Sequence, residues 1–178
     1  MIYLTKEQFE EIIKHCQSEY PKEACGILAG NRSFSPVGNR AFTPMNEPEG
    51  STPEGSTPKG STPKGSTSEN KIVSKVYKMT NTSDNPETCY FMKPEEQLKV
   101  FKEMRQSGIE MLGIYHSHSQ SPAYPSQRDC EMAFYPEVDY VIISLKDYNN
   151  PEIRAFKIIE GKIDEEKIII KGDKTNEP

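Results

Sequence analysis

The stretch 116–129 constrains the fold more than any other part of this chain. It contains two histidines one residue apart, His116 and His118, and it follows an apolar run, 110–115, that is typical of a strand. Side chains at positions i and i+2 of a strand point to the same face. We therefore expect both imidazoles to aim at one point, with Ser117 pointing away.

A carboxylate follows the histidine pair where the sequence predicts a turn into a helix. The pair Pro125–Ser126 predicts a helix start, which places Asp129 on the first helical turn. Two imidazoles and one carboxylate make three ligands of a tetrahedral zinc site, and three protein ligands leave a fourth position for water, as in catalytic zinc sites. A simpler interpretation stays open, because Ser-x-x-Asp is by itself a helix-capping pattern and an isolated His-x-His is often incidental.

Composition limits the class of protein. The 178 residues suffice for one domain with a sizeable core. The net charge of −5 and the absence of a basic run argue against a nucleic-acid partner. No apolar stretch reaches membrane-spanning length, and the first residues lack the pattern of a secretory signal. We expect a soluble, cytoplasmic protein.

The cysteines fit that compartment. They show no Cys-x-x-Cys pairing, and we expect reduced thiols, mostly buried, at Cys16, Cys25, Cys89 and Cys130.

Residues 46–70 differ in kind from the rest of the chain. The repeats Ser-Thr-Pro-Glu-Gly and Ser-Thr-Pro-Lys-Gly run from Ser51 to Gly65 without an apolar residue. Such a segment cannot bury enough surface to offset the entropy of ordering it. We interpret 46–70 as a disordered, low-complexity surface loop inserted into one domain that spans 1–178, because closure entropy grows only with the logarithm of loop length.

The first half of the chain predicts a helix and several strands. Thr5 and Gln8 form a capping-box pattern that opens a helix over 6–19. A buried strand is expected at 24–29, and Glu23 directly precedes it. Taken alone, Glu23 is interpreted as a solvated residue at the end of a strand. Gly26 within that strand indicates close approach of another group. A second short strand is expected around 34–37, and another over 72–80.

The second half predicts a helix over 94–106, capped by Gly108, with an apolar stripe of Leu98, Phe101 and Met104. Before it, Tyr90–Phe91 is either a short strand or an anchor into the core. A short helix after Asp129 is expected to carry residues 132–134, and strands are expected at 139–145, 152–159 and 163–171. These elements favour a mixed α/β sheet flanked by helices.

The motifs taken together resemble the JAMM (MPN-plus) metalloprotease family. The family pattern is a distant Glu, then His-x-His, seven residues, and Ser-x-x-Asp, which matches Glu23, His116, His118, Ser126 and Asp129. Apart from 46–70, the chain resembles the small stand-alone prokaryotic members almost end to end. The resemblance implies a single domain with a curved mixed sheet and flanking helices, related to the cytidine-deaminase scaffold.

The resemblance also implies roles. His116, His118 and Asp129 would bind Zn²⁺, Glu23 would hold and deprotonate the attacking water, and Ser126 would help to stabilise the oxyanion. Ser119 departs from the family, because many relatives have proline there. This leaves the ligands intact but makes the stiffness of the following loop an open question.

The implied reaction is hydrolysis of an amide or isopeptide bond after the Gly-Gly C-terminus of a ubiquitin-like or sulfur-carrier protein. Two alternatives are a deconjugating isopeptidase acting on proteins that carry ubiquitin-like modifiers and a non-catalytic MPN scaffold. A nucleobase deaminase is disfavoured, because its His-x-Glu and Pro-Cys-x-x-Cys patterns do not occur. The sequence leaves the partner carrier and the oligomeric state open.

Overall fold

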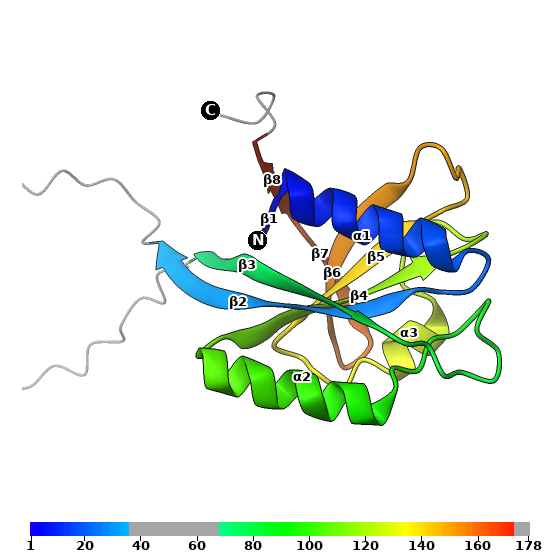
Figure 1. Cartoon of the computed structure of the whole chain (residues 1–178). Coiled ribbons are helices and arrows are strands. Elements are labelled where there is room, and N and C mark those ends of the chain that lie inside the picture. The colour runs from blue at the N-terminus through cyan, green and yellow to red at the C-terminus, as the bar shows by residue number, and fades with distance from the viewer. Residues whose placement is uncertain (36–67, 173–178) are drawn as a thin grey trace, which may run out of the picture.

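A computed structural model describes residues 1–35 and 68–172, which build one curled, mixed sheet of eight strands with helices on both faces (Figure 1). The strand order is β7-β6-β5-β4-β2-β3-β1-β8. The elements are β1 (Ile2–Thr5), α1 (Lys6–Glu19), β2 (Cys25–Ser35), β3 (Ser68–Met79), α2 (Pro94–Ser107), β4 (Glu110–His118), α3 (Gln127–Glu131), β5 (Asp139–Ser144), β6 (Glu152–Ile159), β7 (Lys162–Glu166) and β8 (Ile168–Lys171). The predicted α/β class is confirmed.

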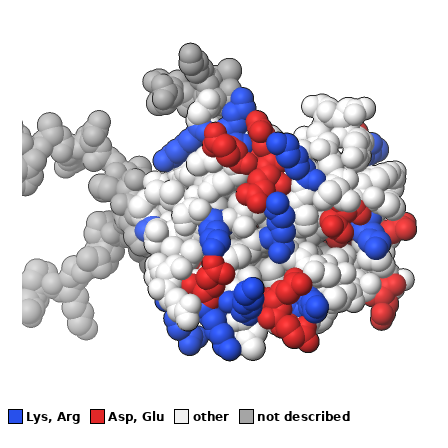
Figure 2. Space-filling view, in the orientation of Figure 1, with Lys and Arg blue, Asp and Glu red and all other residues white. Residues whose placement is uncertain are grey.

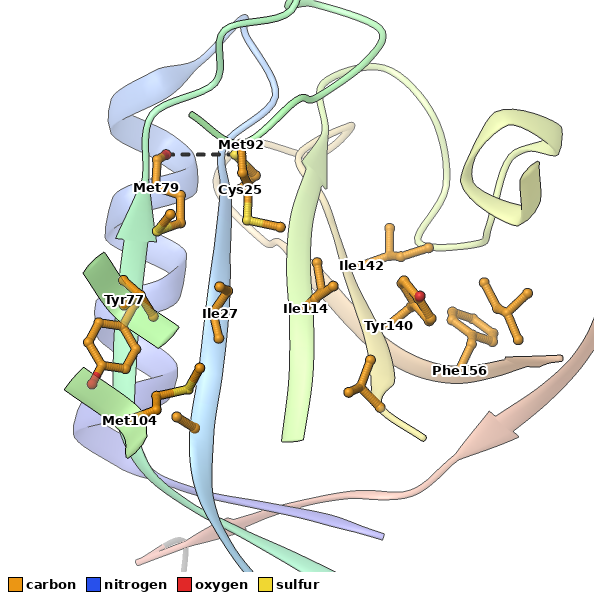
Figure 3. Close-up of a cluster of buried hydrophobic side chains, with 14 of the residues drawn as sticks. Cys25, Ile27, Tyr77, Met79, Met92, Met104, Ile114, Tyr140, Ile142 and Phe156 are labelled. Carbon is orange, nitrogen blue, oxygen red and sulfur yellow. Dashed lines mark hydrogen bonds between the residues drawn. The ribbon is translucent and has the colours of Figure 1, made fainter. Parts of the chain in front are cut away.

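Strand direction changes along the sheet. The pairs β4–β5, β1–β3 and β1–β8 are parallel, and the other neighbours are antiparallel. Because successive side chains of a strand point to opposite faces, the sheet buries two separate apolar layers. One layer packs against α2 and includes Ile27, Ile114 and Ile142 (Figure 3), and the other packs against α1 and includes Leu28, Leu112 and Val141.

Both long helices begin and end as their sequences predict. The capping box of α1 is formed, with the Thr5 side chain accepting from Gln8 N and the Gln8 side chain accepting from Thr5 N. Gly108 ends α2 with a φ of 64°. The predicted stripe of α2 was partly wrong, since Leu98 is 56% exposed and the buried residues are Val100 and Met104. Two positions correspond to about 200° around a helix, so Leu98 faces away from Val100.

The strands at the edges depart most from expectation. The strand β1 was not predicted, because four residues are too few for a periodic signal. The expected strand 163–171 breaks at Lys167 into two. Strand β7 pairs with β6, whereas β8 pairs with β1 at the opposite edge of the sheet. Strand β6 directly precedes β7, whereas β1 lies at the other end of the chain from β8, so this distant partner decides that the two halves separate.

Strands β2 and β3 frame the low-complexity segment. Strand β2 runs unbroken to Ser35, where a second strand was expected, and Ser35 pairs with Ser68 at the start of β3. Residues 68–70, assigned above to the inserted loop, belong to the sheet, because β3 pairs with β2 before its first apolar residue, Ile72. Residues 36–67 and 173–178 lie outside the described part, so the extent of the loop and of the single domain over 1–178 stay predictions.

Gly26 lies at a close approach between neighbouring strands. A Cβ atom at this position would collide with the ring of Tyr115 and with the carbonyl oxygen of Tyr77. This confirms the close approach expected from a glycine inside a strand. The buried Tyr115 ring therefore packs directly against the β2 backbone, beside the histidine pair on β4.

The surface shown in Figure 2 carries acidic and basic side chains interspersed, without a large area of one sign. Within residues 1–35 and 68–172, no helix has the length and apolar character needed to cross a bilayer.

Candidate metal centre

The candidate site lies where β4 ends, close to α3 and at the end of the sheet away from the join between β2 and β3 (Figure 1). Strand β4 continues through both histidines because it is paired on both sides. His116 lies opposite Cys25 of β2 and Ile142 of β5, and His118 lies opposite Ser144 of β5. Pairing on both sides at His116, and with β5 at His118, holds the two histidines in the i, i+2 relation that the sequence predicted.

The two imidazoles converge. The Nε2 atoms of His116 and His118 are 3.1 Å apart, and both side chains are buried. Asp129 closes the group, with Oδ1 3.2 Å from His116 Nε2 and Oδ2 3.4 Å from His118 Nε2. These three residues form a group that could hold a metal ion.

Asp129 is held by the helix cap that the sequence suggested. The Ser126 hydroxyl accepts a hydrogen bond from Asp129 N at 3.2 Å, and Asp129 Oδ2 accepts one from Ser126 N at 2.7 Å. The helix ends at Glu131, so residues 132–134, expected in it, follow it instead; the chain turns there toward the buried Val138 and β5. The capping interpretation and the ligand interpretation are both compatible with this geometry, because the cap fixes the carboxylate that faces the histidines.

The separations fit a tetrahedral ion. With Zn–N and Zn–O bonds near 2.0–2.1 Å, tetrahedral ligands lie about 3.3 Å from one another. The two Nε2 atoms are 3.1 Å apart, and the two oxygens of the Asp129 carboxylate lie 3.2 Å from His116 Nε2 and 3.4 Å from His118 Nε2, all close to that value. His118 Nδ1 lies 2.9 Å from the carbonyl oxygen of Pro122, and donating to it leaves the Nε2 lone pair free for a metal. The donor set, two imidazoles and a carboxylate, also suits zinc.

Electrostatics favour a neutral His116 and an ionised Asp129, whereas His118 holds a proton more readily than a free histidine. Burial lowers the pKa of His116. Burial acts in the same direction on His118, but hydrogen bonds to Asp129 and Pro122, with the charges of Asp129 and Glu23, raise its pKa overall. Burial disfavours ionised Asp129, yet hydrogen bonds with His116, His118 and Ser126 hold the pKa of this carboxyl well below its usual range.

Glu23 is buried rather than solvated, with 5% of its surface exposed. Its backbone is fixed on both sides, because Glu23 N donates to Pro86 O at 2.6 Å and Glu23 O accepts from Asn81 Nδ2 at 2.9 Å. Burial raises the pKa of this carboxyl to about 7. The solvated strand-end interpretation was therefore wrong.

A cavity of about 190 Å³ joins Glu23 to the centre. Its lining includes Glu23, His118, Ser119 and Ser126. The Ser126 oxygen accepts from Asp129 N, so the hydroxyl proton is available to donate into this cavity. The Ser119 hydroxyl lies 3.5 Å from Glu87 O at the same cavity. Of the five residues expected from the motif, Glu23, His118 and Ser126 thus line one cavity. The other two, His116 and Asp129, lie beside His118 in the group that could hold a metal ion.

Three further residues organise the site. Ser117, on the opposite face of β4 from the histidines, accepts from Ala24 N at 2.9 Å and donates from its own N to Ala24 O at 3.0 Å, which ties β4 to the residue after Glu23. Asn81 ties the loop after β3 to Glu23. Tyr90 stacks on His116. The sequence offered a signal only for Tyr90, as an expected anchor into the core.

Comparison with known proteins identifies the family. A profile described as prokaryotic homologs of the JAB domain, Prok-JAB, matches residues 5–159. The chain belongs to this family. The matched region contains every motif residue named above and all strands from β2 to β6.

Relatives of this JAB-family chain carry names of cleaving enzymes. The chain is 32% identical over 157 residues to the CysO-cysteine peptidase of Mycobacterium tuberculosis, covering 88% of this chain and 82% of that protein. It is 28% identical over 162 residues to a probable TtuB-protein conjugate cleaving protease of Thermus thermophilus, with coverage of 91% and 79%. It is 31% identical over 145 residues to a desampylase of Haloferax volcanii, with coverage of 79% and 78%.

Solved structures agree on the fold. A solution structure of a protein from Desulfitobacterium hafniense matches with a TM-score of 0.70 and 34% identity, covering 96% of this chain and 93% of that one. A second solution structure, from Salinibacter ruber, matches with a TM-score of 0.56 and 24% identity, covering 98% of this chain and 94% of that one, and supports the fold alone.

Proposed function

We propose that this JAB-family protein is a zinc peptidase that hydrolyses the amide or isopeptide bond after the Gly-Gly C-terminus of a ubiquitin-like or sulfur-carrier protein. The observation that carries the proposal is the convergence of His116 Nε2, His118 Nε2 and the Asp129 carboxylate beside a cavity lined by a buried glutamate. The names of the relatives support the reaction class.

Each motif residue has a role in this proposal. His116, His118 and Asp129 would hold the ion, which when bound supplies a Lewis acid that polarises a carbonyl and acidifies water. Glu23 acts as general base: burial raises its pKa toward neutrality, where a carboxylate accepts a proton most effectively. Ser126 donates its hydroxyl proton to the developing oxyanion, because its oxygen is already held by the helix cap.

The relatives favour a carrier protein as substrate. One acts, by its name, on a cysteine adduct of CysO, and a second on protein conjugates of TtuB. The first name favours peptide-type cleavage that releases a small group, and the second favours isopeptide cleavage. The second candidate function is therefore a deconjugating isopeptidase, which would use the same residues. A scaffold without activity would have no need of a glutamate buried beside the ligand group.

The four free cysteines suit a reducing compartment, so we place the reaction in the cytoplasm. Neither a nucleic acid nor a membrane is part of the proposal.

The decisive experiment compares zinc-loaded wild type with Glu23→Gln in single-turnover cleavage of a carrier protein fused through its Gly-Gly end to a small leaving group. We expect about one zinc per chain in both proteins, because Glu23 is not a ligand. The rate should fall by about 10²–10⁴-fold, because general-base catalysis contributes that much. Products are identified by intact mass, with a cysteine adduct and a lysine isopeptide as parallel substrates.

Two outcomes would contradict the proposal. If metal analysis finds full zinc occupancy in a triple variant of His116, His118 and Asp129, the assigned centre is wrong. If the Glu23→Gln rate equals that of wild type, Glu23 is not the base.

A further inference from the structure

The two histidines of the centre are held in different ways. The imidazole of His118 has its Nδ1 atom 2.9 Å from the carbonyl oxygen of Pro122, a contact that fixes the ring and its tautomer. Nδ1 of His116 is fully buried and has no hydrogen-bond partner among the described residues. Rotation about the ring torsion of histidine is soft, so a ligand histidine needs some contact to set its plane.

A tyrosine supplies that contact. The rings of Tyr90 and His116 are stacked, with centroids 4.6 Å apart and planes 25° from parallel. The neighbouring ring of His118 lies 5.0 Å away at 56°, which is not a stacked arrangement. Aromatic stacking of this kind contributes beyond simple burial, and it restricts the plane of the ring it covers.

Tyr90 is itself held by a tightly bonded loop. Asn81 Oδ1 accepts from Phe91 N at 3.0 Å, Asn81 Nδ2 donates to Cys89 O at 3.1 Å, and the same Nδ2 lies 2.9 Å from Glu23 O. Asn81 also pairs with Met92 in an antiparallel bridge. The backbone on both sides of Tyr90 is therefore hydrogen-bonded to Asn81, which also bonds to Glu23. These bonds hold the Tyr90 ring in place over His116.

We propose that Tyr90 is a positioning residue for the metal centre: its ring fixes the imidazole plane of His116 so that Nε2 points at His118 and Asp129. In this role it replaces the hydrogen bond that Nδ1 of His116 lacks. The inference rests on the proposed function only in that the three residues bind zinc. It does not depend on which substrate is cleaved.

The test is a zinc competition titration against a chromogenic chelator, with four proteins compared. Tyr90→Leu removes the ring, and its affinity should fall by about tenfold or more, as for other outer-shell contacts of metal ligands. Tyr90→Phe keeps the stacked ring and should stay within about threefold of wild type. Phe91→Leu is the matched control, since Phe91 is 49% exposed, lies in the same loop and makes no ring contact with His116.

Thermal unfolding of the zinc-free proteins separates positioning from folding. If Tyr90→Leu fails to fold, Tyr90→Met, whose longer, flexible side chain can follow the space of the ring without a planar face, takes its place in the titration.

Wild-type affinity in a folded, ring-free variant would overturn the inference, as would a Tyr90→Phe loss equal to that of Tyr90→Leu, or an equal loss in Phe91→Leu. If wild type binds no zinc, the proposed function fails instead, so the two failures are distinguishable.

Discussion

At the scale of single residues, hydrogen bonding and burial shift the pKa values of two carboxyl groups at the centre, those of Asp129 and Glu23. Asp129 is the third residue of a short helix, and the same carboxylate that completes the cap faces both histidines. Among the residues that the structure describes, the Glu23 carboxylate has no such hydrogen-bond partner, and burial raises its pKa. Two carboxylates near one cavity thus have pKa values shifted in opposite directions, which suits one as a ligand and the other as a base.

The raised pKa of Glu23 predicts a pH-dependent stability of the zinc-free protein. The folded protein keeps the proton of Glu23 up to about pH 7, whereas the unfolded chain releases it near 4.5. Between these values the unfolded state binds fewer protons, so stability falls as pH rises, by about 1.4 kcal/mol per unit and roughly 3 kcal/mol in all. Glu23→Gln removes this dependence.

Denaturant unfolding from pH 4.5 to 7.5, with zinc removed by a chelator, measures this difference. If the free energy of unfolding changes with pH in the same way for wild type and Glu23→Gln, the pKa of Glu23 is not raised in the folded protein.

At the scale of elements, the site is assembled where separate segments end. Strand β4 supplies two residues of the proposed metal-binding group, α3 supplies the third, and the loop after β3 holds Glu23 and Tyr90 in place through Asn81. The other end of β2 and β3 carries no site residue, and the two strands pair with each other up to Ser35 and Ser68. The repeat at 51–65 is therefore attached at the end of the sheet opposite to the centre.

We predict that deleting residues 51–65 leaves the fold intact. The deletion removes no apolar side chain and roughly halves the connection between β2 and β3, so it should raise stability by about 0.6 kcal/mol or less. Thermal unfolding and zinc titration of the deletion variant provide the check. A cooperative loss of structure would mean that the repeat packs against the domain.

At the scale of the whole molecule, one buried ion pair forms only because the sheet is curled. Lys71 Nζ lies 2.6 Å from Asp139 Oδ1, and the two side chains are 2% and 0% exposed. Lys71 is on β3 and Asp139 starts β5, and β2 and β4 lie between these strands. Three strand spacings in a flat sheet are about 14 Å, more than the two side chains span, so the sheet must curl to bring them together.

Breaking this pair should be costly. Lys71→Met leaves Asp139 buried without its cation and should destabilise the fold by about 3–5 kcal/mol, whereas Lys71→Met combined with Asp139→Leu should recover most of the loss. Lys162→Met, at the exposed pair with Asp164, is the control and should change stability by less than about 1 kcal/mol. Chemical denaturation of wild type, Lys71→Met, Asp139→Leu, the double variant and the control measures the coupling energy; losses of the two single variants that add up to the loss of the double variant would contradict the pairing.

The sequence by itself determined the parts that depend on short-range spacing. The helix over 6–19, its cap, the turn at Gly108 and the strand that carries His116 and His118 follow from local periodicity and capping chemistry. The convergence of His116, His118 and Asp129 followed as well, because these residues are close in the chain and the i, i+2 rule of a strand fixes the direction of the two histidines.

Only the tertiary structure decided what depends on distant partners. The burial of Glu23, the stack of Tyr90 on His116, the return of β8 to β1 and the Lys71–Asp139 pair all join residues from segments separated by other elements. No local period encodes such contacts, since they arise from the order of strands in the sheet and from its curl. Whether a glutamate before a strand is a solvated charge or a buried carboxyl with a raised pKa is set by what packs around it.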